Sequence, residues 1–172
     1  PHELIVDSLT QYQGTAKANT VMWPHRYNDD KQPDIAEKLS SDFDMVITQK
    51  MNLNKADYYA TMGTSKAIFS CALHENLGIS VMEAVLTGAI PIVPDRCSYA
   101  EMYLPEFKYP SEWTENYEQF IYHRDDMVKF INTRLVYNFA DYQDLIKQQQ
   151  QILIKDYLSS SIMINNLLKK GT

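Results

Sequence analysis

The sequence predicts an α/β fold in which a doubly wound parallel sheet is followed by a C-terminal helical extension. Three observations support this prediction. Short apolar segments and helix-compatible segments alternate as far as residue 93, the apolar segments are not interrupted by polar residues, and beyond residue 114 only helical patterns remain. Unbroken apolar strands are typical of parallel sheets whose two faces are covered by helices. The chain of 172 residues is long enough for one such domain with a substantial core.

Four segments are interpreted as buried strands because they are short, apolar and bounded by polar or turn residues. They are residues 19–23, 43–48, 67–72 and 90–93. Residues 33–41, 56–65 and 79–87 have helical spacing and lie between the strands. Pro33 and Asp34 suit the first turn of a helix, and Gly88 suits a left-handed helix end.

The C-terminal part of the chain is expected to be helical at residues 115–123, 125–138, 142–158 and 161–169. The last two helices have apolar side chains on more than one face, so one face should pack on the domain or on a part of the protein outside this sequence. Glutamines 148–151 are interpreted as a solvated face, and the aromatic residues between 99 and 113 as a packed loop. Residues 1–18 have weak periodicity. We therefore divide the chain into a linker or edge segment at 1–18, the main domain at 19–140 and C-terminal helices at 141–172.

The composition excludes several classes of protein. Sixteen basic and 22 acidic side chains give a formal net charge of −6, which disfavours wrapping of nucleic acid around the whole surface. No apolar run approaches the roughly 18 residues of a membrane span. Cys71 and Cys97 cannot build a disulfide framework, so we expect a soluble protein in the cytoplasm. The sequence opens on Pro1 without a start methionine or a signal peptide, and we interpret it as part of a longer chain.

Residues 70–88 carry the most chemical information. Here a predicted strand ends, a tight loop turns at Gly78 and a helix begins. The loop lies at the carboxyl ends of the strands, where parallel sheets bind ligands, and the first helical turn offers N–H groups to an anion. Glu75 and Glu83 flank this expected anion site. Because carboxylates repel phosphate, we expect both to accept hydrogen bonds from hydroxyls, such as those of a nucleotide diphosphate sugar.

The loop after the first predicted strand places positive charge at the same edge of the sheet. Arg26 can bind two phosphate oxygens, and Lys31 adds a point charge. Two such contacts of about 1.5 to 3 kcal/mol each would support binding of a diphosphate. Arg96, after the fourth strand, is a lesser candidate that either faces the cleft or forms a surface ion pair.

A structural interpretation of the same residues stays open. Arg26 and Lys31 would then pair with neighbouring acids on the surface. Glu75 would be a first-turn acid favoured by the helix dipole, and Glu83 a solvent-facing helix residue. On spacing alone, this interpretation is favoured.

Taken together, the two loops resemble the C-terminal, donor-binding half of retaining GT-B glycosyltransferases, a Rossmann-like domain. The resemblance rests on Arg26 and Lys31, five positions apart, and on Glu75 and Glu83, which have seven residues between them. It covers about residues 19–110. Segments 23–33, 72–75 and 91–101 are most similar to the branch of tRNA-queuosine mannosyltransferases and related phage-type enzymes.

The resemblance implies three catalytic residues. Arg26 and Lys31 would bind the donor diphosphate and stabilise the charge that develops on the departing nucleotide diphosphate. Glu75 would hold the donor sugar at the reacting centre. Such enzymes retain the anomeric configuration and use neither a metal nor a further cofactor, and the sequence shows no convincing metal-ligand cluster.

The resemblance also implies donor-binding residues next to these. The backbone of Asn76, Leu77 and Gly78 would bind the sugar, His74 would touch it, and Glu83 would bind the ribose. Asn76 stands where the wider group often has glycine, and Leu77 replaces a common aromatic residue. These two departures leave the identity of the donor sugar open.

The leading functional hypothesis is therefore the donor-binding half of a retaining, metal-independent hexosyltransferase. Its acceptor would be bound mainly by an absent N-terminal half, so that this piece alone is expected to be inactive. A tRNA, modified DNA, a glycan or a lipid headgroup all remain open as the acceptor. The alternatives are a GT-B-fold sugar-nucleotide epimerase and a non-catalytic nucleotide- or partner-binding module.

Overall fold

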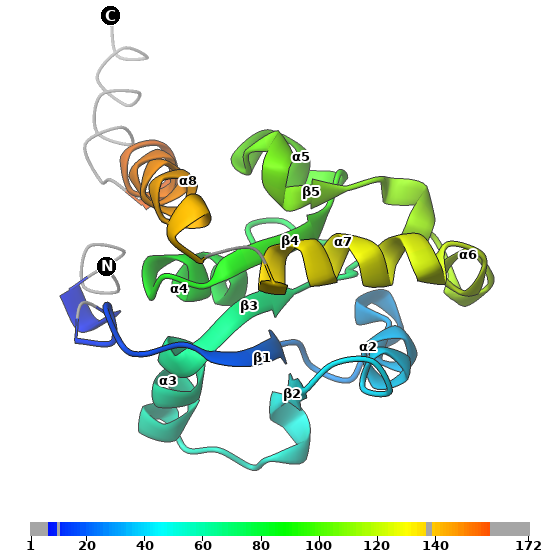
Figure 1. The fold of residues 1–172 in the computed structure, drawn as a ribbon, viewed down its shortest axis with the longest axis horizontal. Coiled ribbons are helices and arrows are strands. Elements are labelled where there is room, and N and C mark those ends of the chain that lie inside the picture. Colours follow the sequence, from blue (N-terminus) through cyan, green and yellow to red (C-terminus); the bar gives the residue numbers. More distant parts are fainter. Residues whose placement is uncertain (1–6, 10, 137–138, 159–172) are drawn as a thin grey trace, which may run out of the picture.

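The computed structural model describes residues 7–9, 11–136 and 139–158. A five-stranded sheet in the order β2-β1-β3-β4-β5 forms its centre (Figure 1). The strands are β1 (Ala18–Trp23), β2 (Met45–Ile47), β3 (Ser65–Phe69), β4 (Ile90–Pro94) and β5 (Lys108–Tyr109). All four strand pairings are parallel. The predicted fold class, a Rossmann-like α/β domain with C-terminal helices, is confirmed.

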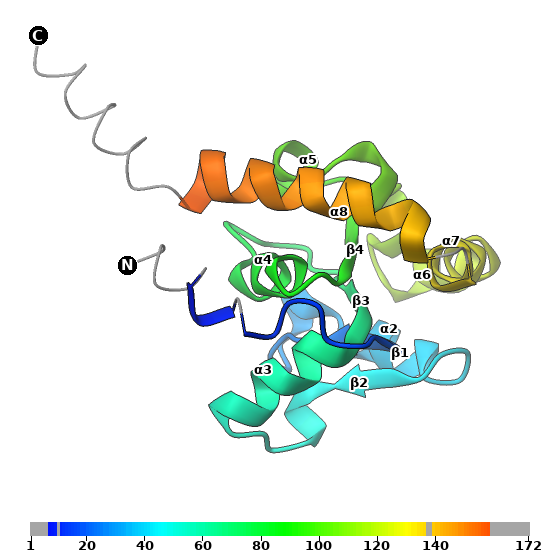
Figure 2. The ribbon, with the colours of Figure 1, turned by 60° about the vertical axis from the view of Figure 1, so that its left-hand side comes forward.

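Helices cover both faces of the sheet (Figure 2). They are α2 (Pro33–Leu39), α3 (Lys55–Thr64), α4 (Ile79–Leu86), α5 (Cys97–Met102), α6 (Tyr117–Tyr122), α7 (Arg124–Val136) and α8 (Phe139–Ile152), with a π-helical segment, Leu153–Leu158, continuing α8. One buried apolar cluster joins the sheet to α2, α6 and α7. A second cluster joins the opposite face to α3, α4, α5 and the end of α8. This two-faced core is what unbroken apolar strands require, because every side chain of such a strand must be buried.

The inner strand β1 fixes the position of the loops that follow the strands. Val21 is paired with Met45 of β2 on one side and with Ala67 of β3 on the other. The chain then continues through α2 on one face and, after β3, through α4 on the other. The carboxyl ends of β1 and β3 therefore lie side by side, with their connections leaving in opposite directions.

The predicted end of α4 is confirmed in detail. Gly88 has a φ of +89°, the left-handed conformation expected there. Its N–H donates to the Val85 carbonyl at 2.9 Å, and the Ala89 N–H donates to the Ala84 carbonyl at 2.9 Å. This pair of bonds closes a helix and allows β4 to begin at Ile90 without a longer loop.

Several predicted boundaries differ from the observed ones. The predicted strand at 43–48 is shorter because Thr48–Lys50 forms a 3₁₀ turn, and the strand predicted at 67–72 runs from Ser65 to Phe69. The sequence does not predict β5 or α5, which lie in the segment expected to be a packed loop. The aromatic packing expected there is confirmed, since Tyr99, Tyr103, Phe107 and Tyr109 are buried. The helix predicted at 161–169 lies outside the described residues.

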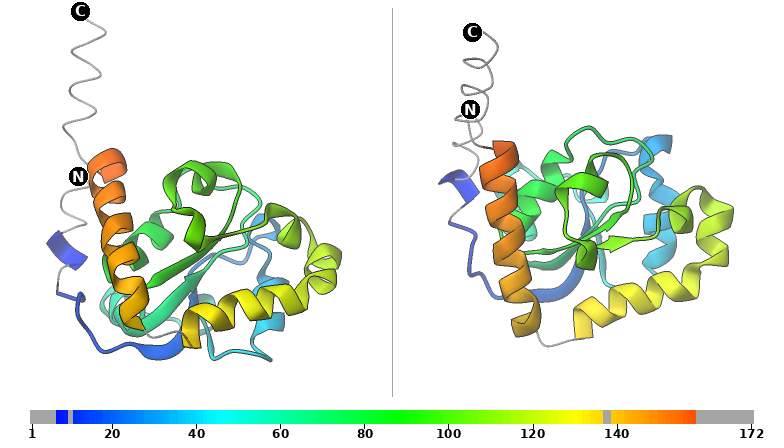
Figure 3. Two further views of the ribbon diagram at one scale, coloured as in Figure 1. Left: turned by 45° about the horizontal axis from the view of Figure 1, so that its top comes forward. Right: turned by 90° about the horizontal axis from the view of Figure 1, so that it is seen from above.

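Helices α7 and α8 lie at a wide angle, like the two arms of an L (Figure 3). Gln149 of α8 is fully buried, so the interpretation of 148–151 as a solvated face is wrong at this residue. Its amide donates to the Met102 carbonyl at 2.8 Å and accepts from the Leu104 N–H at 2.8 Å. These two bonds fix α8 to the segment that follows α5. The division of the chain at residues 18 and 140 stays a prediction.

Candidate functional site

The candidate site lies at the carboxyl ends of β1 and β3. In doubly wound sheets with this strand order, ligands bind where the connections of neighbouring strands leave toward opposite faces. Residues 24–32 follow β1 and residues 70–78 follow β3. The two segments are joined to each other, since the Leu73 N–H donates to the Asp30 carbonyl at 2.7 Å. The structure thus brings together the two loops that the sequence singles out.

Lys31 and Glu75 connect these loops by an ion pair. Lys31 Nζ lies 3.2 Å from Glu75 Oε2 and 3.1 Å from Asp30 Oδ2, and it also donates to the carbonyl of His74. Both members of the Lys31–Glu75 pair are largely shielded from solvent, with side chains 14% and 18% exposed. The positive charge of Lys31 is therefore already balanced by two carboxylates.

Glu75 also closes the turn that opens α4. Its Oε1 accepts a hydrogen bond of 3.0 Å from the N–H of Gly78, whose φ is +66°. A Cβ at Gly78 would lie 2.7 Å from Cε1 of the buried Tyr99, so this turn accommodates only glycine without displacing the ring. The N–H groups of Ile79 and Ser80 follow, and as first-turn groups they have no intrahelical acceptor. The turn presents backbone donors toward a ligand that approaches the end of β3.

Glu83 is buried on α4 and is held by one of its two oxygens. The hydroxyl of Tyr59, on α3, donates to Glu83 Oε1 at 2.8 Å. Burial raises the pKa of Glu83, while the hydrogen bond from Tyr59 and the charge of Lys55 lower it. Burial and the bond to Glu83 raise the pKa of Tyr59 to about 12, so its hydroxyl remains a donor. No donor among the described residues occupies Oε2, which can accept a further hydrogen bond. The interpretation of Glu83 as a solvent-facing residue is wrong.

The other expected site residues differ in how they are placed. Arg26 is exposed, and its guanidinium forms no hydrogen bond or ion pair with any described residue. His74 and Asn76 are exposed, whereas the side chain of Leu77 packs against the apolar cluster on the α4 face. Leu77 can therefore serve a ligand only through its backbone. Their roles toward a donor stay predictions.

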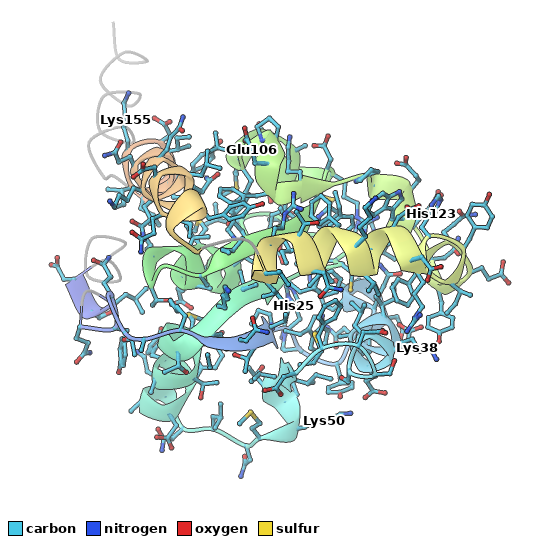
Figure 4. The ribbon with its side chains drawn as sticks, in the orientation of Figure 1. His25, Lys38, Lys50, Glu106, His123 and Lys155 are labelled. Atoms are coloured by element: carbon cyan, nitrogen blue, oxygen red, sulfur yellow. The ribbon has the colours of Figure 1, made fainter. Side chains whose placement is uncertain are left out.

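A buried network that sequence reasoning missed lies beneath these loops. His25 Nε2 is 2.8 Å from Ser70 Oγ, and the hydroxyls of Tyr99 and Tyr109 donate to Ser70 Oγ and to its carbonyl, respectively. Burial, followed by the nearby charge of Lys31, lowers the pKa of His25 to about 4. His25 is thus a neutral imidazole in the middle of the molecule (Figure 4). The sequence signal for this pair is that each residue follows the end of one of two neighbouring strands. Tyr59, by contrast, had no such signal.

Arg96 has a structural role that corrects the expectation of a cleft-facing or ion-paired side chain. Its guanidinium donates to the carbonyls of Cys71, Ala72 and Ser111 and to two oxygens of Thr114. The bonds are between 2.8 and 3.0 Å long. Arg96 therefore ties the loop after β3 to the segment after β5 and has little capacity left for a ligand.

A cavity of about 540 Å³ lies at the opposite edge of the sheet, beside Lys17 and Gly88. There Lys17 Nζ donates to the carbonyls of Gly63 and Thr87 at the ends of α3 and α4, and burial lowers its pKa to about 8. The C-terminal ends of two helices, with their carbonyl groups, meet here, which makes this edge unfavourable for a phosphate.

The part of the chain that the structure describes contains no group of three potential metal ligands and no helix long and apolar enough to cross a membrane.

The fold belongs to the doubly wound class, and a comparison with curated proteins gives it a more specific relationship. The chain is 24% identical over 119 residues to the tRNA-queuosine alpha-mannosyltransferase of Drosophila melanogaster, with 52% of this chain and 32% of that protein covered. The chain thus spans about a third of the length of this relative. No protein-family profile matches it. The similarity indicates a distant, glycosyltransferase-like relationship and supports a transferase at most.

Proposed function

We propose that this chain is the donor-binding half of a retaining GT-B glycosyltransferase that uses a nucleotide diphosphate sugar. One observation carries the proposal. The loops and helix around the ends of β1 and β3 contribute three features: the unpaired side chain of Arg26, the Glu75–Gly78 turn, and the Glu83 carboxylate. Only one oxygen of that carboxylate has a hydrogen-bond donor among the described residues. This set offers a cation and backbone donors for phosphates, together with carboxylates for the hydroxyls of the ribose and the sugar. The distant similarity to a mannosyltransferase supports the same assignment.

In this proposal the residues act on the leaving group and not on the acceptor. The bond between the anomeric carbon and the diphosphate oxygen breaks, the acceptor oxygen bonds to the same face of the sugar, and the acceptor's proton passes to the departing diphosphate. Arg26 stabilises the negative charge that appears on the departing diphosphate. Lys31 contributes to the same charge only after it leaves Glu75, since the two are paired at 3.2 Å. No metal and no further cofactor takes part.

The acceptor is assigned to an N-terminal half of the same protein. The name of the similar fly protein favours a nucleoside of tRNA as the acceptor. Modified DNA, a glycan or a lipid headgroup are the other acceptor classes to be screened. We place the protein in the cytoplasm, where both nucleotide sugars and tRNA are available.

Calorimetric titration of the 172-residue chain with UDP, GDP and their hexose conjugates tests the proposal. We expect binding in the micromolar to millimolar range and a loss of about tenfold or more for Arg26→Ala, the value of one charge-assisted contact. Arg124→Ala is the matched control, because Arg124 is on α7 and pairs with Asp42. The absence of any heat or shift at millimolar nucleotide would contradict the proposal.

Reaction products of the complete protein separate the remaining alternatives. A transferase consumes the nucleotide sugar only when an acceptor is present. An epimerase releases an isomeric sugar nucleotide, and a non-catalytic module binds the nucleotide without turnover. Incubation of the full-length protein with a labelled nucleotide sugar, without an acceptor and with tRNA, modified DNA, glycans and lipids in turn, distinguishes all three.

A further inference from the structure

His25 and Ser70 form a buried hydrogen bond between the ends of adjacent strands. His25 follows β1, Ser70 follows β3, and 2.8 Å separate Nε2 from Oγ. His25 is only 5% exposed to solvent, and Ser70 is fully buried. A hydrogen bond in such surroundings is shielded from competing water and holds its two partners in one geometry. This contact therefore links the loop that carries Arg26 to the loop that carries Glu75.

The direction of this bond follows from the other partners of Ser70. The Tyr99 hydroxyl donates to Ser70 Oγ at 3.2 Å, and the Tyr109 hydroxyl donates to the Ser70 carbonyl at 2.8 Å. The Ala72 N–H also donates to Ser70 Oγ, at 3.4 Å, so both lone pairs of this oxygen are used and its own proton is available for His25 Nε2. A neutral imidazole that accepts at Nε2 fits this network, and the pKa of about 4 at His25 agrees with the neutral form.

Arg26 lies between two anchored residues. His25 on one side is held by Ser70, and its ring packs edge-on against Trp23 with centroids 5.5 Å apart. Tyr27 on the other side packs against the same Trp23 at 5.8 Å, and its hydroxyl donates to Glu37 on α2 at 2.8 Å. The backbone of Arg26 is consequently fixed on both sides, while its exposed side chain remains free.

We infer that His25 is a positioning residue that holds Arg26 at a fixed distance from the Glu75–Gly78 turn through its hydrogen bond to Ser70. The inference rests on the proposed function, because it assigns His25 a role in the binding of the same diphosphate. His25 itself need not touch the ligand. Its contribution is to remove the freedom that the β1 loop would otherwise have to lose when an anion binds.

A mutant cycle on the dissociation constant of UDP or GDP tests this inference. His25→Leu removes the acceptor, whereas His25→Gln keeps an oxygen near the position of Nε2. We expect His25→Leu to weaken binding about tenfold, and His25→Gln to remain within about threefold of the original protein. In an Arg26→Ala background, His25→Leu should cause no further loss. His123→Gln, a histidine beside Trp113, is the matched control and should leave the dissociation constant unchanged.

Ser70→Ala gives a second route if His25→Leu does not fold. It removes the same hydrogen bond from the opposite side, and it should weaken binding by a similar factor. Equal losses from His25→Leu with and without Arg26 would overturn the inference, since His25 would then act on the fold in general. If the nucleotide binds and Arg26→Ala weakens it but neither His25→Leu nor Ser70→Ala does, the inference fails while the proposed function stands. If the unmodified chain binds no nucleotide, both fail.

Discussion

Lys31 and Glu75 form an ion pair between the loops that follow β1 and β3, with 3.2 Å between Nζ and Oε2. The residue expected to bind phosphate is therefore paired to the residue expected to bind the sugar. Arg26, five residues earlier, has no such partner among the described residues. Both cations are expected to bind the diphosphate, but in the folded chain Lys31 is in an ion pair and Arg26 is not.

The shielding of this ion pair predicts a measurable coupling in stability. In a double-mutant cycle of Lys31→Met and Glu75→Gln, followed by urea unfolding, we expect a coupling free energy of about 1 to 2 kcal/mol. The pair of Lys50 and Glu37 is the control, because its side chains are 55% and 44% exposed. Such an exposed pair should give a smaller coupling, because solvent screens its charges. Equal coupling in both cycles would contradict the shielded geometry at Lys31.

Removal of the Tyr59 hydroxyl should raise the pKa of Glu83 further. Tyr59→Phe removes the bond to Oε1 that lowers this pKa, and the burial that raises it remains. Titration of the Glu83 carboxyl carbon by NMR measures the change. Tyr58→Phe is the neighbouring control, because the described contacts include no hydrogen bond from Tyr58 to Glu83. An unchanged Glu83 titration in Tyr59→Phe would show that the hydrogen bond has no effect in solution.

Gly78→Ala should destabilise the chain more than Gly14→Ala, although both glycines have positive φ values, +66° and +75°. Strain of the left-handed backbone costs about 1 to 2 kcal/mol in each case. At Gly78 the new methyl group also lies 2.7 Å from the Tyr99 ring, whereas at Gly14 nothing lies within 4 Å. Forced displacement of a buried ring adds about 1 to 3 kcal/mol. Urea denaturation of both variants measures the difference, which should shrink in a Tyr99→Leu background.

The lowered pKa of His25 predicts that the folded chain loses stability in mild acid. Its pKa is about 4 in the folded chain, compared with about 6.5 for an unperturbed histidine, so the unfolded chain binds more protons between these values. The associated stability is fully present above pH 6.5 and is lost as the pH falls toward 4. The expected loss is about 3 kcal/mol. Urea midpoints from pH 7 to pH 4 measure it, with His25→Gln as the comparison.

The comparison with His25→Gln isolates this effect from other titrating groups. Glu83 acts in the opposite direction, because its raised pKa favours the folded state in acid. That contribution is the same in both proteins. The curve for His25→Gln should therefore be flatter by the histidine contribution alone, and parallel curves would exclude a buried neutral His25.

The parallel sheet could be predicted because its signals are local. The apolar segments of β1, β3 and β4 are buried on both faces and therefore read as unbroken runs. Gly88 likewise marks the end of α4, since its left-handed conformation is a property of one residue. The short β5, by contrast, has only two residues and pairs through the backbone of β4, so no periodicity reveals it.

The candidate site could be predicted in position but not in its contacts. The edge of the sheet follows from the strand order, whereas the partners of Glu83 and Arg96 depend on side chains from distant segments. Tyr59 is 24 residues from Glu83, and Thr114 is 18 residues from Arg96. Such pairs form only when tertiary packing brings the segments together, and a single sequence contains no periodic signal for them.

The buried position of Gln149 has a practical consequence for the design of shorter fragments of the protein. A polypeptide trimmed at residue 138 would lack the amide that satisfies the Leu104 N–H and the Met102 carbonyl. It would also expose to solvent the apolar surface of α4 that Leu153 and Leu158 help to cover. Fragments intended for crystallisation or spectroscopy should therefore extend through Leu158, because shorter ones would be prone to self-association.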